Sequence, residues 1–157
     1  MKILKVIPRQ SIGKIKIGMN REEVYSILGM PKKQETIEWI GDYHIEYDND
    51  KVVFIEVPNS IVDTHFVLFN GVDLFGTEAK LLVKYISEYG KYDETDEELG
   101  YSYSFKTLGI GLWRPSIFEY EMINREEFQE LDEENQLDEI QNLYFESVCV
   151  FQENYYD

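Results

Sequence analysis

The chain has 157 residues, of which 43% are hydrophobic and 15% aromatic, enough for the packed interior of one ordinary domain. Its 31 Asp/Glu and 15 Lys/Arg give a formal net charge of −16, which argues against binding to nucleic-acid phosphates or to an anionic membrane surface. A single cysteine excludes an internal disulfide, and no apolar run approaches the roughly 20 residues of a spanning helix. Residues 1–10 do not have the pattern of a signal peptide, so we expect a soluble cytoplasmic protein.

This charge is distributed unevenly along the chain. Residues 1–60 hold nine Lys/Arg and nine Asp/Glu and are neutral, whereas residues 61–157 hold six Lys/Arg against 22 Asp/Glu. Because like charges repel one another in a compact state, such segregation favours a role in solubility or in the choice of a partner. We predict one domain, 1–157, with a neutral first half and an acidic second half, and a basic protein as its partner.

The clearest local signal is a short helix near the N-terminus. Asn20 and Glu23 have the spacing of a capping box. The apolar residues that follow fall on one helical face: Val24, Ile27 and Leu28. Gly29, in the position of a left-handed C-terminal residue, and Pro31 then end the helix. The pattern predicts a helix over 20–28.

Extended structure is expected on both sides of this helix. A short extended segment is predicted at 12–17, and three strands at 37–40, 43–48 and 51–57. In 43–48 the apolar and polar residues alternate, as in a half-buried strand, and residues 48–50 have turn chemistry. The first half is therefore predicted to be a helix followed by an antiparallel meander.

The second half begins with two apolar runs, 66–69 and 72–75, joined by Asn70-Gly71, the strongest short marker of a β-hairpin. Thr77 is placed to cap a helix that should run to Tyr89. The predicted buried stripe of that helix contains Leu81, Leu82, Tyr85, Ile86 and Tyr89. The remaining strands are predicted at 101–105, 108–113 and 143–151.

An acidic insertion precedes the last of these strands. Residues 119–139 hold ten Asp/Glu and one Arg, and Asn124 with Glu127 has the spacing of a capping box, so we predict one exposed acidic helix. The order helix, strand, strand, strand then occurs twice. We predict an α+β fold in which two helix-plus-meander halves place both helices on one face of an antiparallel sheet.

The first half also carries a resemblance. Residues 15–24, Ile-Lys-Ile-Gly-Met-Asn-Arg-Glu-Glu-Val, and residues 28–31, Leu-Gly-Met-Pro, resemble the opening motif of beta-lactamase-inhibitor-protein-like and SmpA/OmlA-like domains. Those families carry an extended Ile/Leu-x-Leu-Gly-Met segment, a short helix and Leu-Gly-x-Pro. The resemblance covers residues 12–31 and implies a helix pair packed on an antiparallel sheet, together with binding of proteins rather than catalysis. The lipoprotein signal of the outer-membrane members is missing, so that location is not expected.

A second, more distant resemblance covers the acidic half. Gly-x-x-Leu-Phe at 71–75 and Leu-Gly-Ile-Gly-Leu-Trp-Arg at 108–114 are similar to segments of small acidic immunity proteins from toxin loci of Gram-positive bacteria. This similarity implies binding to a toxin.

The residues needed for nucleophilic catalysis are sparse. Such catalysis requires a Ser or Cys beside a His that takes its proton. The two histidines are His44, on the polar face of a predicted strand, and His65, before the hairpin. Cys149 lies between two valines of the last strand, where a buried, inert thiol is expected.

Metal and acid–base sites have similarly weak support. The acidic run 93–98 places Glu98 where a calcium loop requires Gly. We therefore expect no enzyme activity, cofactor or metal site. An enzyme built from carboxylates alone, such as Asp73 or Glu46 with a tyrosine, stays open as an alternative.

The leading hypothesis is an immunity or antitoxin-like protein that neutralises a basic, nuclease-type toxin by covering its cationic site. Tyrosines among carboxylates suit such an interface, because they combine charge steering with stacking under guanidinium groups. The predicted partner-binding residues are Asp93, Glu94, Asp96, Glu97, Glu98, Tyr101, Tyr103, Glu119, Tyr120, Glu121, Glu126, Glu127, Glu130, Asp132, Glu133 and Glu134. The alternative is a general scaffold or inhibitor domain that binds through an aromatic sheet face around Trp39, Tyr43 and His44.

Overall fold

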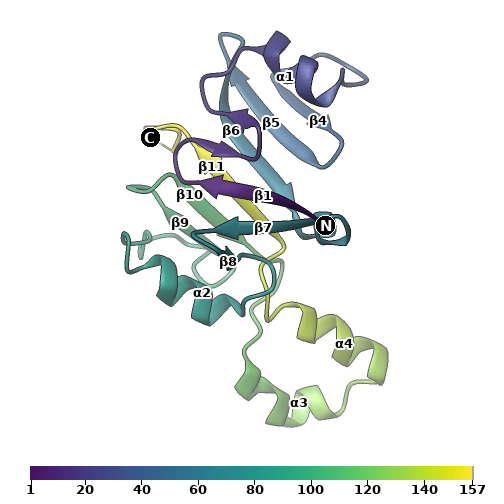
Figure 1. Ribbon diagram of the computed structural model, residues 1–157. Coiled ribbons are helices and arrows are strands. Elements are labelled where there is room, and N and C mark those ends of the chain that lie inside the picture. Colours follow the sequence, from purple (N-terminus) through teal and green to yellow (C-terminus); the bar gives the residue numbers. More distant parts are fainter. Residues whose placement is uncertain (157) are drawn as a thin grey trace.

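A computed structural model describes residues 1–156 and shows two β-sheets with helices packed beside them, the predicted α+β class (Figure 1). The larger sheet has six antiparallel strands in the order β4-β5-β6-β11-β10-β9. In chain order these strands are β4 (Ile37–Ile40), β5 (Tyr43–Asp48), β6 (Lys51–Pro58), β9 (Ser102–Phe105), β10 (Ile110–Trp113) and β11 (Ser147–Phe151). The smaller sheet has the order β3-β2-β1-β7-β8. Its strands are β1 (Lys2–Ile7), β2 (Ser11–Ile12), β3 (Ile15–Lys16), β7 (His65–Phe69) and β8 (Val72–Asp73).

Two meanders build the larger sheet and meet at their third strands. Strands β4 to β6 form the first meander, β9 to β11 form the second, and β6 pairs antiparallel with β11. The junction places Ile55 opposite Val150 and Val57 opposite Val148, four fully buried side chains. A helix precedes each meander, α1 (Arg21–Leu28) and α2 (Ala79–Ile86). The predicted repetition of helix and meander is therefore confirmed as an order of elements.

The smaller sheet contains the predicted segment at 12–17 and the predicted hairpin at 66–75, but β1 and the joining of these strands into a second sheet were not predicted. The prediction of a single antiparallel sheet was therefore wrong. Its central pair, β1 and β7, is parallel, and Figure 1 shows these strands lying across the larger sheet. The pattern of β1 conceals its role, because Leu4 and Val6 are buried while the equally apolar Ile3 and Ile7 are exposed. The predicted extended segment at 12–17 is a hairpin of β2 and β3, and one core cluster joins both sheets.

Helix α1 forms as its sequence predicts at the N-terminus. The Asn20 side chain accepts a hydrogen bond from the backbone N–H of Glu23 at 2.9 Å, and the Glu23 carboxylate accepts one from the Asn20 N–H at 3.4 Å. Gly29 has φ 91° but ψ −177°, so it ends the helix in an extended rather than a left-handed helical conformation. Only Val24 of this helix is fully buried, and the predicted burial of Ile27 is wrong because its side chain is 41% exposed.

Helix α2 is shorter than predicted and ends at Ile86. The predicted cap, Thr77, is not the N-cap: its hydroxyl donates to the backbone oxygen of Asp73 at 2.7 Å. Glu78 stands at the N-cap and makes no side-chain capping hydrogen bond. Leu82 and Ile86, one helical turn apart, are completely buried, whereas Leu81 is 57% exposed and turns toward solvent. Tyr89 lies beyond the helix and is also exposed.

The predicted acidic helix is instead broken into three pieces. These are η2 (Tyr120–Asn124), α3 (Glu126–Gln129) and α4 (Glu133–Gln141). Like charges three and four residues apart disfavour one continuous helix. Asn124 caps nothing, and α4 is capped by Asp132, whose carboxylate accepts from the Asn135 N–H at 2.8 Å. We call residues 115–146 the acidic arm, which Figure 1 shows projecting from the two sheets. Within residues 1–156, no helix has the length and apolar character needed to cross a membrane.

The first prediction uses the two neighbouring leucines of α2. Leu82→Ala should lower the free energy of unfolding by about 2–5 kcal/mol, since it leaves a cavity in the core. Leu81→Ala, the matched control, should change it by no more than about 0.5 kcal/mol because that side chain is largely in solvent. Urea unfolding followed by circular dichroism measures both. Equal losses in the two variants would show that this face of α2 is assigned wrongly.

Candidate partner-binding surfaces

Arg114 fixes the acidic arm to the sheets. It follows directly after β10, and only 1% of its side chain is exposed. Its guanidinium donates hydrogen bonds to the backbone oxygens of Gly100 at 2.9 Å, Phe118 at 3.1 Å and Asn142 at 2.8 Å. A fourth hydrogen bond, at 3.0 Å, joins it to the Glu119 carboxylate. One buried cation therefore holds the outgoing segment of the arm, its returning segment and the end of the 93–98 loop.

The arm has a small apolar core of its own. Phe118, Phe128 and Leu143 are buried together, with five half-buried neighbours: Met122, Ile123, Leu131, Ile140 and Tyr144. The backbone N–H of Ala79 in α2 donates to the Leu143 oxygen at 2.7 Å, and Lys80 lies 3.4 Å from the Glu121 carboxylate. The arm is thus a packed unit attached at several points, unlike the single exposed helix predicted from its sequence.

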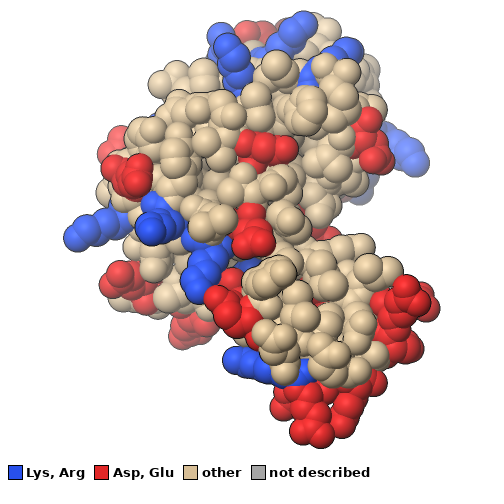
Figure 2. Space-filling model, turned by 60° about the horizontal axis from the view of Figure 1, so that its bottom comes forward, with Lys and Arg blue, Asp and Glu red and all other residues tan. Residues whose placement is uncertain are grey.

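Most of the predicted partner-binding acids lie on this arm. Figure 2 shows Asp and Glu side chains gathered along the edge of the lower lobe, whereas most of the Lys and Arg side chains in this view lie on the rest of the molecule. The exposed acids on α3, on α4 and between them are Glu126, Glu127, Glu130, Asp132, Glu133 and Glu134. In residues 1–156, none of these six carboxylates lies within 4.0 Å of a Lys or Arg nitrogen. Their charge is therefore presented to solvent.

The other predicted acids of the arm have partners within the protein. Glu119 is bound to Arg114, and Glu121 pairs with Lys80. A backbone hydrogen bond and the Lys80 ammonium lower the pKa of Glu121. These two carboxylates help to attach the arm, which sequence reasoning did not anticipate.

The acidic loop over 93–98 is ordered by its own carboxylates. Asp93 accepts hydrogen bonds from the Thr95 hydroxyl at 2.6 Å and the Thr95 N–H at 2.9 Å, and lies 3.1 Å from Lys106. These contacts, the Thr95 bonds first, lower the pKa of Asp93 to about 2. Asp96 accepts from the N–H of Glu98 at 2.9 Å. Two of the five predicted acids thus stabilise turns, while Glu94, Glu97 and Glu98 face solvent.

The three predicted tyrosines have different environments. Tyr120, on the arm itself, is 64% exposed, and Tyr101 is exposed at the base of the 93–98 loop. Tyr103 instead packs edge-on against Tyr92 and Phe145, with ring centroids 5.1 and 5.9 Å away. Because β9 alternates its faces, Tyr103 points toward the core and its ring serves internal packing.

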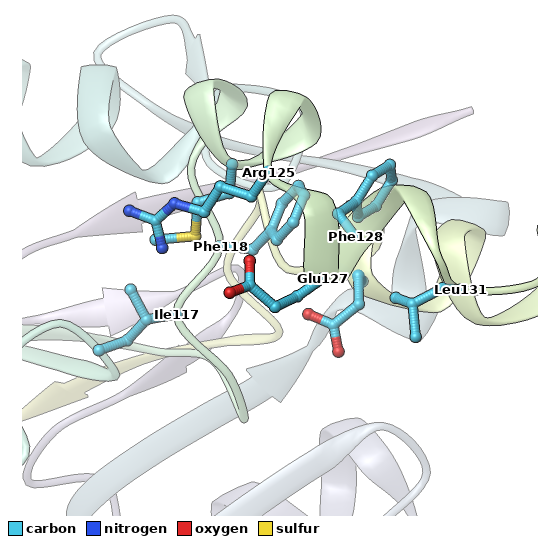
Figure 3. A pocket seen from close by; sticks show the side chains of 8 residues that line it. Ile117, Phe118, Arg125, Glu127, Phe128 and Leu131 are labelled. Atoms are coloured by element: carbon cyan, nitrogen blue, oxygen red, sulfur yellow. The ribbon is translucent and has the colours of Figure 1, made fainter.

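A hollow of about 380 Å³ lies in the surface of the arm. Apolar side chains that include Phe118, Met122 and Leu131 line it, together with Arg125 and the carboxylates of Glu127 and Glu139. Figure 3 shows the Glu127 carboxyl group reaching in front of the Phe118 ring. Such a hollow can accept the apolar stem of a long cationic side chain and face its charge with carboxylates.

The outer face of the larger sheet is a second candidate surface. Strand register places Trp39, His44, Glu56 and Cys149 in one row across that face. Tyr43, which was predicted to belong to the same aromatic face, points to the opposite side and is buried. Burial, and to a smaller extent Asp42, raises the pKa of Tyr43 to about 12.

His44 stands at the centre of a polar cluster on this outer face. Its Nδ1 lies 3.1 Å from Glu56 Oε1 and its Nε2 3.3 Å from Glu46 Oε2. The hydroxyl groups of Ser147 and Tyr155 donate to Glu56 at 3.2 Å and to Glu46 at 2.6 Å. Tyr155 therefore packs onto the sheet, and burial raises its pKa. The cluster was not predicted because it joins the β5–β6 hairpin to Ser147 and Tyr155, which lie about 90 or more residues further along the chain.

The groups considered for chemistry are placed as follows. Cys149 is buried, and this burial raises the pKa of its thiol. Asp73 accepts backbone hydrogen bonds from Phe75 and Gly76 and shapes a turn. Glu46 does contact a tyrosine, Tyr155. In residues 1–156, no group of three or more His, Cys, Asp or Glu side chains is arranged to hold a metal ion.

The anchoring role of Arg114 can be tested by Arg114→Met. The variant keeps an apolar stem but leaves Glu119 and three backbone oxygens without their donor, so the free energy of unfolding should fall by about 3–5 kcal/mol. Arg125→Met, a change at an exposed arginine, should cost less than about 0.5 kcal/mol. Hydrogen exchange should rise at amides of 115–146 first. Unchanged exchange there would contradict the assigned anchor.

The lowered pKa of Asp93 in the acidic loop can also be tested. Because the folded pKa of Asp93 lies below its ordinary 3.8, its contacts stabilise the loop above that pH and lose their effect as pH falls toward 2. Thr95→Val removes the hydroxyl donor and should raise the Asp93 pKa toward 3.8. Carbon NMR of the carboxyl group follows the titration. Thr107→Val is the control and should leave it at about 2.

Comparison of the chain with models of known protein families, with curated protein sequences and with solved structures gave no match.

Proposed function

We propose that this protein binds a basic protein through its acidic arm, as an immunity or antitoxin-like protein that covers the cationic site of a nuclease-type toxin. The observation that carries the proposal is the concentration of six exposed carboxylates on an anchored, projecting unit. None of the six has a Lys or Arg partner within residues 1–156. A cationic surface is the chemical complement of such a unit.

Electrostatics supports this kind of partner. Holding like charges together on one unit opposes folding, and a bound cationic surface relieves that repulsion. Fields of this kind raise association rates by roughly ten to a thousandfold, and the gain falls as salt screens the charges. A nuclease must itself present Lys and Arg to phosphates, so its active surface suits the arm.

The hollow in the arm supplies a contact of shorter range. Phe118 and Leu131 offer apolar surface to the stem of a Lys or Arg. Its charge would meet two carboxylates, those of Glu127 and Glu139, against the one cation of the lining, Arg125. The outer carboxylates would first steer the partner toward the arm, and a Lys or Arg side chain of the partner would then insert into the hollow. This combination favours a protein partner over a dissolved cation, because only a long side chain uses both parts.

The alternative is a scaffold that binds through the outer sheet face. The observation in its favour is the exposure of two tryptophans on that face, Trp39 at 66% and Trp113 at 39%. In that case the acids of the arm contribute only solubility, and replacing them leaves binding unchanged.

Charge neutralisation on the arm separates the two functions. A variant with Glu126, Glu127, Glu130, Glu133 and Glu134 changed to Gln should bind the partner at least about a hundredfold more weakly, since five carboxylates leave the interface. The matched control changes five exposed acids elsewhere to their amides: Asp42, Asp48, Asp63, Glu88 and Glu153. It should bind within about threefold of the wild type. Both variants should keep the wild-type circular dichroism spectrum.

The partner for this measurement comes from capture on the tagged protein in extracts of its native host, at about 50 mM and 500 mM salt. We expect a basic protein that is lost at the higher salt, and whose nuclease activity falls stoichiometrically when this protein is added. Recovery of no basic protein, binding indifferent to salt, or full inhibition by the five-Gln variant would each overturn the proposal.

A further inference from the structure

A second cavity, of about 440 Å³, opens on the outer sheet face at the root of the acidic arm. It is lined by residues of β4, β5, β6, the 3₁₀ helix η1 (Asn59–Asp63), the end of β10 and the start of β11. Trp113 immediately precedes the anchor Arg114, and the N–H of Glu146 donates to the Trp113 oxygen at 2.7 Å. The two segments that lead into and out of the arm thus meet at this cavity.

Both tryptophans of the chain line this one cavity. The Trp39 ring stacks on the imidazole of His44, with centroids 4.2 Å apart and planes at 20°, yet the side chain remains 66% exposed. Trp113 comes from the other meander and is 39% exposed. Large aromatic surface left in solvent on two separate strands, and directed to one cavity, is typical of a binding site.

The charge of the cavity is negative. Glu56 is held in place by His44 at 3.1 Å and by the Ser147 hydroxyl at 3.2 Å. The Glu146 carboxylate makes no hydrogen bond or ion pair with any group in residues 1–156. The residues that line the cavity include no Lys or Arg. A ligand with positive charge is therefore the one that matches this lining.

Indole rings and carboxylates together select among cations. The negative face of an indole attracts a cation placed over it, and Trp is the strongest aromatic side chain in this respect. A guanidinium group is planar, weakly hydrated and able to donate to a carboxylate with two parallel hydrogen bonds, whereas an ammonium is compact and strongly hydrated. The cavity thus matches a guanidinium better than a lysine ammonium.

We propose that this cavity receives an arginine side chain of the basic partner, with its guanidinium against Trp39 or Trp113 and its N–H groups on Glu146 and Glu56. That the arginine belongs to a basic partner rests on the function proposed above. That the cavity prefers a guanidinium group does not. A partner that lies along the arm reaches the cavity at its root, so one bound protein engages both sites. The arm steers the partner, and the cavity fixes its orientation.

The experiment uses the full chain and N-acetyl-arginine-amide as the probe. Because both tryptophans line the cavity, intrinsic fluorescence reports this site directly. We expect a saturable change with the arginine probe, at least about threefold weaker binding of N-acetyl-lysine-amide, and no saturable change with the neutral citrulline analogue. A change that rises linearly with all three compounds is collisional quenching and overturns the proposal, as does equal binding of the citrulline analogue. Equal binding of lysine overturns the guanidinium preference.

Matched variants locate the site. Glu146→Gln should weaken binding of the arginine probe at least about fivefold, and because its carboxylate has no partner among residues 1–156, folding should not change. Glu153→Gln, an exposed acid outside the cavity, is the control and should bind as the wild type. Trp39→Phe leaves Trp113 as the reporter and should also weaken binding. Unchanged affinity in both Glu146→Gln and Trp39→Phe places the probe elsewhere and refutes the assignment.

The two proposals fail separately. The five-Gln arm variant should bind the arginine probe within about threefold of the wild type, because its substitutions lie outside the cavity. If the probe binds saturably but no basic partner is captured, the arginine-binding cavity stands and the toxin-binding function is refuted. If a salt-sensitive basic partner is captured and both Glu146→Gln and Trp39→Phe bind it normally, the toxin-binding function stands. The cavity then has no part in binding that partner.

Discussion

The hydrogen bonds of the buried Arg114 guanidinium are the interaction on which the acidic arm depends. Arg114 is the largest side chain removed from water in the described structure, and it satisfies three backbone oxygens and one carboxylate from segments that do not otherwise form a sheet. A lysine has one nitrogen and no planar fork, so it cannot replace this geometry. The acids of the arm can stay in solvent because Arg114, with the arm's other attachments and its small apolar core, holds the backbone beneath them in place.

The sequence predicted correctly those features that depend on interactions between residues close together in the chain. The capping box of Asn20 and Glu23, the alternation over 43–48 and the Asn70-Gly71 turn each act within a few residues, and each forms as predicted. Asn70 and Gly71 both adopt the positive φ that such a turn requires. The repeated helix and meander followed from these signals, since consecutive strands tend to pair.

Long-range features were beyond such reasoning. The parallel pairing of β1 with β7 has no turn or periodic signature in either strand, because it joins residues that are far apart in the chain. The breaks in the arm depend on Phe118 and Leu143 closing a core around Phe128. The same holds for the candidate sites. The acids of the arm were found by composition, whereas the cavity between Trp39 and Trp113 exists only because β6 and β11 join two meanders.

That junction also governs when the molecule can fold. Strand β11 stands in the middle of the larger sheet and pairs Phe151 with Phe54, yet it is the last of the six strands of that sheet to be synthesised. Until β11 arrives, the inner edge of β6 is an unpaired edge that can join other chains. Closing so long a loop also slows folding. The acidic residues between these two strands, 61–146, give the unfinished chain a growing negative charge. Repulsion between chains of this charge opposes their pairing at the open edge.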